Sequence, residues 1–437
     1  MGHISQNNLY RKLGKKIDQL PTRAPWNASL YAILKELYTP EEADVVVKMP
    51  YGFSNLIRIA RITKYDWKLL EKIMQELCLK GLVLDIFANG EFYYSPCPIV
   101  VGIFELTMMR TGGNLNTKKW ARLFYDYFHE SESIFRANYQ RGDKISLMRS
   151  LPYEETIKNP YYVEILDYER VEEIVKSADR FAIGICSCRH EKLHIGRQEC
   201  ATPLETCSNF GFAADYMIRH KLAKEVSKSE MLENVARSQE LGLVFNADNV
   251  QKNISFICHC CKCCCNVLMG VSKFGCPETI VTSSFISEID NGLCSGCGKC
   301  AQACPVDAIA MIPQEGQTAQ QAMAPQVDKD FCLGCGVCGL ACAPKAIGLV
   351  KRKKRVLHPE TTFARVMLYS LERGTLQNQL FDDPSSITQD FIRAFLGGFL
   401  KLKPVKRALV SDVLRSTFLS VLKKGAQSRG KGWATDI

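Results

Sequence analysis

The sequence reads CSGCGKCAQACP from Cys294 to Pro305 and CLGCGVCGLAC from Cys332 to Cys342. Each stretch spaces its four cysteines as C-x2-C-x2-C-x3-C. The first three thiolates share a tight, glycine-containing loop and can face one metal cluster, whereas the fourth is displaced by a short helical turn and points elsewhere. The pattern therefore predicts two thiolate-ligated clusters that exchange one ligand each.

This spacing is typical of bacterial-type ferredoxins, which hold two 4Fe-4S clusters and in which the fourth cysteine of each run ligates the other cluster. By that rule the first cluster is held by Cys294, Cys297, Cys300 and Cys342. The second is held by Cys332, Cys335, Cys338 and Cys304. The alternatives are a zinc ribbon or a set of disulfides. Zinc sites use two distant C-x2-C pairs, so the unbroken runs favour iron–sulfur clusters.

The chain of 437 residues contains 21 cysteines and is long enough for about three domains. Its N-terminus has no secretory pattern, and the longest apolar run, Cys97 to Phe104, is far too short to span a bilayer. We therefore expect a cytoplasmic protein whose cysteines bind metal in a reducing compartment instead of forming disulfides. So many oxygen-sensitive thiolates also suggest an anaerobe.

Residues 26–100 have the pattern of a winged-helix-like domain. Helical spacing from Ala28 to Leu37 is followed by Thr39 and Pro40, which mark a helix start. The further elements expected are helices near 55–62 and 66–79 and hairpin strands at 82–87 and 91–94.

The expected recognition surface of this domain is poor in basic side chains. Its helix opens with Asp66 and continues with Glu71 and Glu76, and the wing at 87–92 contains no Lys or Arg. Binding in a DNA groove requires cations that neutralise phosphates. We therefore expect a docking or structural role and no nucleic acid partner.

A second group of cysteines lies in the middle of the chain. Cys186, Cys188, Cys200 and Cys207 form a C-x-C pair after an apolar strand and two more cysteines beyond a Gly and Pro break. They are the expected ligands of a third iron–sulfur cluster, with zinc as the alternative.

The densest stretch, CHCCKCCC, has six cysteines in eight residues, and these form a possible fourth set whose ligating members the pattern leaves open. They are Cys258, Cys260, Cys261, Cys263, Cys264 and Cys265. On a strand or a helix about three thiolates would share a face. Residues 186–276 contain eleven cysteines, enough for one or two clusters with thiols to spare. An open iron site, a redox-active thiol pair or buried small side chains remain alternatives for part of this set.

The net charge of +10 belongs to the C-terminal tail. Residues 351–437 carry 17 basic and 7 acidic side chains, whereas residues 1–350 carry 39 of each. Apolar spacing predicts helices at 363–371, 387–399 and 405–422, and no structure at 428–437. The tail could lie on an anionic membrane, dock an acidic partner or pack on its own protein.

The expected fold class is α+β. The domains expected are a winged-helix-like domain (26–100), a helical connector (101–178), a central Cys-rich α/β domain (179–290), a bacterial ferredoxin-like dicluster domain (291–350) with a surface loop at 314–326, and a basic helical extension (351–437). The order of the parts from about 25 to 350 also resembles a group of uncharacterised iron–sulfur proteins of anaerobes. That resemblance implies electron exchange with a partner oxidoreductase or flavoprotein.

We predict an electron-transfer protein that relays low-potential electrons through two ferredoxin-type clusters and one or two additional clusters. It would serve an oxidoreductase complex, because no G-x-G-x-x-G or P-loop motif indicates a flavin, nicotinamide or nucleotide site of its own. The alternatives are a redox-sensing winged-helix transcription regulator and a reductase with an open-site cluster between Cys258 and Cys265.

Overall fold

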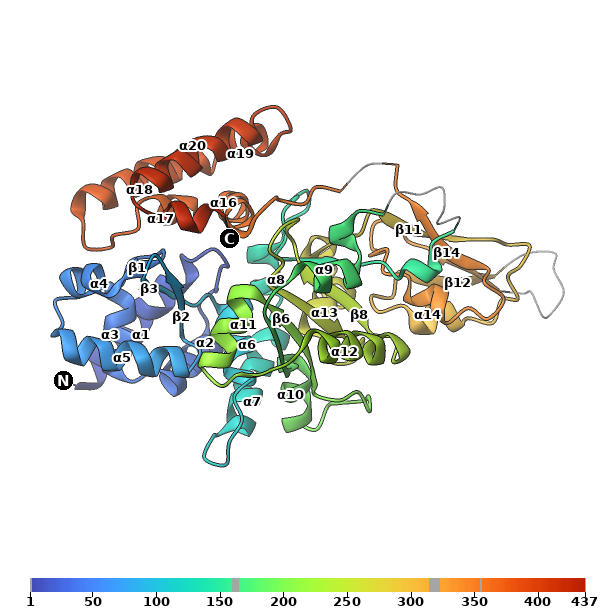
Figure 1. The fold of residues 1–437 in the computed structure, drawn as a ribbon, viewed down its shortest axis with the longest axis horizontal. Coiled ribbons are helices and arrows are strands. Elements are labelled where there is room, and N and C mark those ends of the chain that lie inside the picture. Colours follow the sequence, from blue (N-terminus) through green and yellow to red (C-terminus); the bar gives the residue numbers. More distant parts are fainter. Residues whose placement is uncertain (1, 159–164, 314–322, 354–355, 437) are drawn as a thin grey trace.

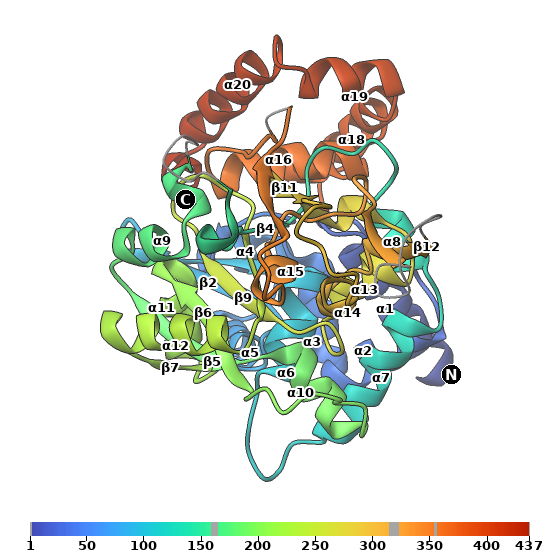
Figure 2. The ribbon, with the colours of Figure 1, turned by 90° about the vertical axis from the view of Figure 1, so that its right-hand side faces the viewer.

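The computed structural model describes residues 2–158, 165–313, 323–353 and 356–436. It contains both helices and sheets, which confirms the expected α+β class. The N-terminal and ferredoxin-like parts lie at opposite ends of the molecule, with the central sheet between them (Figure 1). The C-terminal helices form a separate layer along one side, and the turned view shows the same layer (Figure 2).

The N-terminal part is a helical unit with a small sheet. Its elements are α1 (Gly2–Asp18), α2 (Ala28–Leu37), α3 (Pro40–Lys48), β1 (Ser54–Asn55), α4 (Leu56–Thr63), α5 (Trp67–Leu79), β2 (Val83–Ala88) and β3 (Glu91–Pro96), with strand order β1-β3-β2. The predicted helices and strands lie within about two residues of these bounds. Their assignment to the winged-helix class stays a prediction.

Two details show how the sequence sets this unit. The Thr39 hydroxyl accepts a hydrogen bond from the Glu42 N–H at 3.2 Å, and the Glu42 carboxylate accepts one from the Thr39 N–H at 2.8 Å, so a capping box starts α3 as predicted. Helix α1 was not predicted. Its Leu13 and Ile17 are fully buried in the same core, so this unit begins before residue 26.

A seven-stranded sheet forms the middle of the molecule. Its strands, in spatial order, are β10 (Ile280–Val281), β4 (Met148–Ser150), β8 (Val244–Asp248), β9 (Phe256–Cys260), β6 (Glu205–Phe210), β5 (Phe181–Ile185) and β7 (Ala223–Glu225). The pair β10–β4 is parallel and the other pairs are antiparallel. The helices around it are α6 (Phe104–Met108), α7 (Thr117–His129), α8 (Ser133–Asn138), α9 (Val171–Ser177), α10 (Ser187–His194), α11 (Gly211–Arg219), α12 (Lys228–Glu240) and α13 (Asn266–Ser272).

The segment 101–178 is not purely helical as expected. It supplies β4, whose Met148 pairs with Asp248 of β8 and with Ile280 of β10. A strand of three residues has too short an alternation to be recognised from its sequence, since its partners come from distant parts of the chain. The connector is thus part of the central sheet.

The ferredoxin-like part consists of two antiparallel strand pairs and two short helices. They are β11 (Phe285–Ile289) with β14 (Ile347–Lys351), β12 (Ile309–Pro313) with β13 (Met323–Val327), α14 (Lys299–Ala303) and α15 (Val337–Leu340). The surface loop expected at 314–326 lies partly outside the described residues. Its last residues, from Met323, belong to β13, so the loop prediction was wrong there.

The tail folds into helices α16 (Thr362–Arg373), α17 (Leu376–Leu380), α18 (Ile387–Leu400), α19 (Lys403–Val410) and α20 (Arg415–Ser428). The single helix predicted at 405–422 is divided where Ser411 leaves the helical conformation. The end predicted to lack structure forms a short 3-10 helix, Gly432–Thr435, whose Trp433 ring lies 4.8 Å from that of Tyr93. No helix within the described ranges combines the length and apolar character needed to cross a membrane.

An ion-pair network joins this tail to the N-terminal unit. Asp382 accepts from Arg58 of α4 at 2.7 Å and from Lys431 at 3.0 Å. Burial opposes ionisation of Asp382, but the hydrogen bond from Arg58 and the charge of Lys431 outweigh it and hold the pKa of Asp382 at about 2. The network therefore stabilises the fold only while Asp382 is ionised.

We expect Asp382→Asn to lower the free energy of unfolding by about 2 kcal/mol at pH 7, because the depressed pKa measures the stabilisation of the carboxylate by its partners. Since the folded-state pKa lies below the unfolded value of 3.8, this contribution is complete above that value and is lost as the pH falls toward about 2. Thermal unfolding of the two proteins at several pH values measures it.

Asp412→Asn is the matched control, because the Asp412 side chain is 91% exposed although it also pairs with an arginine. Its melting temperature should equal that of the wild type. An equal loss in both variants would show that the tail is not anchored through Asp382.

Candidate metal centres

The two ferredoxin-like loops are shaped by glycine. Gly298 precedes α14 with φ 72° and Gly336 precedes α15 with φ 85°, a left-handed conformation that glycine adopts without strain. At Gly334, with φ 68°, a Cβ atom would lie 2.1 Å from the Phe285 carbonyl oxygen. These turns bring the cysteines of each run close together.

One small cavity is lined by all four cysteines of the predicted first set, Cys294, Cys297, Cys300 and Cys342. The backbone N–H of Lys299 and the Ser295 hydroxyl donate to Cys297 and lower the pKa of its thiol. Donors aimed at sulfur fit a thiolate that ligates metal. The crossed ligand assignment stays a prediction, and the shared cavity supports it.

The second set, Cys304, Cys332, Cys335 and Cys338, is buried. Burial raises the pKa of Cys304 and of Cys335, and neighbouring thiols add to the effect. Four thiolates can be buried together when a bound metal cluster compensates their negative charge. Polar groups are also in place: the Ser287 hydroxyl lies 3.2 Å from the Cys338 sulfur, and the Ala308 N–H donates to the Cys304 sulfur at 3.2 Å.

In the central region the structure sorts ten cysteines into two groups. The first, called here the four-thiol group, has sulfurs that all lie within 4.8 Å of one another and comprises Cys200, Cys261, Cys263 and Cys264. This differs from the predicted third set, which joined Cys200 to Cys186, Cys188 and Cys207. The reason is that Cys200 lies on the loop between α10 and β6, which reaches the turn after β9.

The second, called here the six-thiol group, comprises Cys186, Cys188, Cys207, Cys258, Cys260 and Cys265. Neighbouring thiols are close enough to shift one another's pKa in the order Cys207, Cys258, Cys260, Cys265, Cys188 and Cys186. The register that pairs Ser208 with Ile257 places Cys207 beside Cys258 on the adjoining strand. This group contains three members of the predicted third set and three of the possible fourth, and which of them ligate stays a prediction.

Two helix starts bring the remaining thiols of this group together. Cys186 occupies the N-cap position of α10, and the Cys265 side chain caps α13. The helices are tied by Asn266, whose side chain accepts from Lys192 and donates to Glu191, both at 2.8 Å. The Leu268 N–H points at the Cys265 sulfur at 3.5 Å. The geometry thus presents sulfurs together with N–H donors, as a metal-thiolate cluster requires.

A buried cation lies between the two groups. Arg189 has no exposed surface, and its guanidinium donates to the Pro203 carbonyl at 2.5 Å, the Thr206 hydroxyl at 2.8 Å and the His259 carbonyl. Burial would lower the pKa of Arg189, but the neighbouring thiols Cys186 and Cys261 more than reverse this. The structure thus places Arg189 against Cys186 of the six-thiol group and Cys261 of the four-thiol group.

The sequence did not reveal two further polar features. Asn246 is fully buried beside Cys260, and neither its amide nitrogen nor its oxygen has a regular hydrogen-bond partner within the described part of the chain. Cys78, Asp85 and His220 also lie within 4.8 Å of one another. In that group Asp85 already pairs with His220 at 2.9 Å and with Arg219, which links β2 to α11. The position of Asn246 beside the thiols depends on the pairing of β8 with β9, so it could not be predicted from the sequence.

The thiols of the ferredoxin-like part and those of the six-thiol group belong to one continuous core. That core contains Cys300, Cys304, Cys332, Cys335 and Cys338 together with Cys260 and Cys265. Tyr153 ties the dicluster domain to the residue before β8, since its N–H donates to the Cys335 carbonyl at 3.0 Å and its hydroxyl to the Leu243 carbonyl at 2.5 Å. Buried side chains of the two thiol regions therefore pack in the same core.

Residues 293–346 match the family model described as a 4Fe-4S dicluster domain. Neither a curated protein nor a solved structure matches the chain. The matched domain, together with the cysteine groups, supports ligation of iron–sulfur clusters and marks an iron–sulfur protein of the electron-transfer class.

Ser287→Ala is expected to lower the reduction potential of one dicluster-domain centre, on the order of tens of millivolts, because the lost hydroxyl no longer stabilises the more negative reduced state. Ser295→Ala should lower the potential of the other centre, since that hydroxyl bonds to Cys297. Redox titration followed by EPR measures both. The assignment of the serines to different centres fails when both variants shift the same signal.

Proposed function

We propose that the chain is a fixed electron relay in which the dicluster domain is joined to a third iron–sulfur centre at the six-thiol group. Clusters of this kind take up and release single electrons at low potential. The continuous core that contains thiols of both regions is the observation that carries the proposal. A free carrier would have no need for such a shared core.

Residues around the dicluster domain hold it in a fixed orientation. The Tyr153 N–H donates to the Cys335 carbonyl at 3.0 Å, and the Lys158 N–H donates to the Leu349 carbonyl of β14 at 2.9 Å. Gly336 packs so tightly that a Cβ would lie 2.3 Å from the Thr156 hydroxyl oxygen. These contacts favour a domain that moves with the central sheet, which keeps the distance between the two thiol regions constant.

The exposure of the thiols suggests where a partner docks. Cys297 is exposed, whereas all of the second set is buried. Electrons from or to a partner oxidoreductase or flavoprotein therefore enter or leave on the side of the first set, where Cys297 is exposed.

The N-terminal unit fits a winged helix in its order of elements and strands, and we assign it a docking role. Trp67 and Leu69 at the start of α5 and Phe87 and Phe92 in the hairpin are exposed large apolar side chains. An apolar surface of this kind favours contact with protein over contact with nucleic acid phosphates.

The full chain, purified without oxygen, should contain about twelve irons and three EPR-active centres after reduction. Cys186→Ser with Cys207→Ser should remove one of these signals and leave the two dicluster signals in place. Cys276→Ser is the control, because Cys276 is a buried cysteine outside both thiol groups, and its iron content should match the wild type.

An iron content of about eight in the wild type would confine the clusters to the dicluster domain and contradict the relay. Survival of all three signals in the double variant would contradict the assignment of the third centre to the six-thiol group.

A further inference from the structure

The four-thiol group is spaced for one metal ion. Its sulfurs are separated by 3.7 Å between Cys200 and Cys261, by 3.8 Å between Cys261 and Cys263, and by 3.4 Å between Cys263 and Cys264. A tetrahedral ion bound to sulfur at about 2.3 Å places its ligands about 3.8 Å apart. The observed spacing lies close to that value.

A cubane requires wider spacing. It attaches each thiolate to a different iron, so the four sulfurs stand farther apart than four ligands of one ion. Among the described residues, neither the dicluster cysteines nor the six-thiol group has four sulfurs that all lie within 4.8 Å of one another. The four-thiol group therefore differs in kind from the cluster sites next to it.

We propose that Cys200, Cys261, Cys263 and Cys264 bind a single tetrahedral metal ion, of the type that zinc forms with four thiolates. A lone iron shares this S4 chemistry, and metal analysis distinguishes the two. The site lies outside the proposed relay and does not depend on it. With four protein ligands it is closed, so its role is structural.

The ion would fasten a loop over the buried arginine. Cys200 comes from the loop between α10 and β6, and the other three ligands come from the turn between β9 and α13. The same loop supplies the Pro203 carbonyl that accepts from Arg189. Leu243, the residue before β8, packs against Cys261 and Cys264, so the site also contacts the start of that strand.

Two adjacent pairs of cysteines on one segment provide matched variants. Cys261→Ser with Cys264→Ser should remove about one zinc per chain and lower the melting temperature, while the iron content and the EPR signals remain those of the wild type. Cys258→Ser with Cys260→Ser should lose about four irons and keep the zinc. Zinc K-edge absorption of the wild type should show four sulfurs at about 2.3 Å.

Loss of about four irons from Cys261→Ser with Cys264→Ser, in a wild type without zinc, would overturn the proposal in favour of a cubane. Zinc that persists in this variant would show that the ion binds elsewhere. Because the absorption edge is measured on the unaltered chain, a variant that fails to fold leaves the test intact. A single iron in place of zinc would support a one-ion site at these four cysteines and would identify its metal as iron.

An independent observation concerns the outer face of the tail. On α18 the side chains of Ile387, Phe391, Phe395 and Phe399 recur every fourth residue and are between 52% and 86% exposed. Residues at this spacing share one helix face. The opposite face is packed, since Arg393, Gly397 and Leu400 are buried. A row of exposed large apolar side chains of this length indicates a binding surface.

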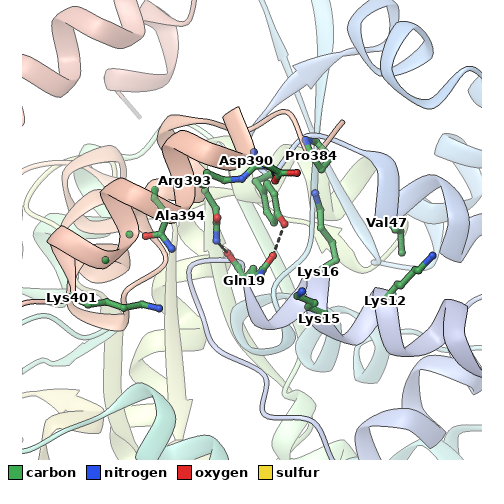
Figure 3. A pocket seen from close by; sticks show the side chains of 15 residues that line it. Lys12, Lys15, Lys16, Gln19, Val47, Pro384, Asp390, Arg393, Ala394 and Lys401 are labelled. Atoms are coloured by element: carbon green, nitrogen blue, oxygen red, sulfur yellow. Dashed lines mark hydrogen bonds and ion pairs between the residues drawn. The ribbon is translucent and has the colours of Figure 1, made fainter. Parts of the chain in front are cut away.

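Basic side chains lie at the C-terminal end of this row and along one side of α18. Lys401, Lys403 and Arg407 follow it and are exposed. A cavity of about 530 Å³ between α1 and α18 is lined by Lys401 together with Lys12 and Lys15, as Figure 3 shows. Among the described residues that line it, Asp390 is the acidic one, and it pairs with Arg393.

We infer that this face of α18 lies on an anionic membrane surface, with the apolar row inserted and the lysines beside it facing lipid headgroups. The excess of basic over acidic groups in residues 351–437 supports a negatively charged occupant over a second copy of this basic tail. The inference holds whatever the redox partner is.

The full chain should sediment with vesicles that contain phosphatidylglycerol, bind several-fold less to vesicles of phosphatidylcholine alone, and lose binding in 0.5 M salt. Phe391→Ser with Phe395→Ser should abolish sedimentation, whereas Phe87→Ser, at another exposed apolar site in the hairpin, should leave it unchanged. No binding to either vesicle would overturn the inference. Self-association of the wild type that the double variant abolishes would do so as well.

Discussion

The central part of the fold depends on how the charge of ten neighbouring thiols is balanced. A buried guanidinium without a counter-charge is costly, as is a buried thiolate. Arg189 lies beside Cys186 and Cys261, so its positive charge and the negative charge of these thiolates compensate each other. Its guanidinium is held in place by hydrogen bonds to the Pro203, Thr206 and His259 oxygens. Those three acceptors come from the loop before β6, from β6 and from β9, so the same cation sets how these strands and α10 meet.

The dicluster domain packs directly on the central region that contains these thiols. Its buried cysteines share a core with Cys260 and Cys265, and Tyr153 connects the backbone at Cys335 with that at Leu243. Electron exchange depends on distance, and a rigid contact keeps that distance at one value. Cys297 of the first set is exposed, so the proposed relay has one open side at which a partner could exchange electrons.

The parts of the site that depend on local spacing could be read from the sequence, and the parts that depend on strand pairing could not. Each ferredoxin-like run brings three thiols together within one loop, so its pattern is sufficient. In CHCCKCCC the strand ends at Cys260, and neither a continuous strand nor a continuous helix sorts the thiols correctly. Cys258 and Cys260 stay on the sheet with Cys207, whereas the turn carries Cys261 to Cys200. Likewise the short strand β4 and helix α1 are defined by distant partners.

The separation of the sheet thiols from the turn thiols lets the two proposed kinds of metal site, a cluster and a single ion, lie next to each other. A cluster that changes charge during electron transfer disturbs the groups around it, and Arg189 is one of those groups. The redox-inactive ion proposed for the four-thiol group would keep a constant charge during electron transfer and would hold the loop that supplies the Pro203 carbonyl. The guanidinium then keeps its position whether the neighbouring centre is oxidised or reduced. A second redox centre in that place would change its charge close to Arg189, and a fixed orientation would be harder to maintain.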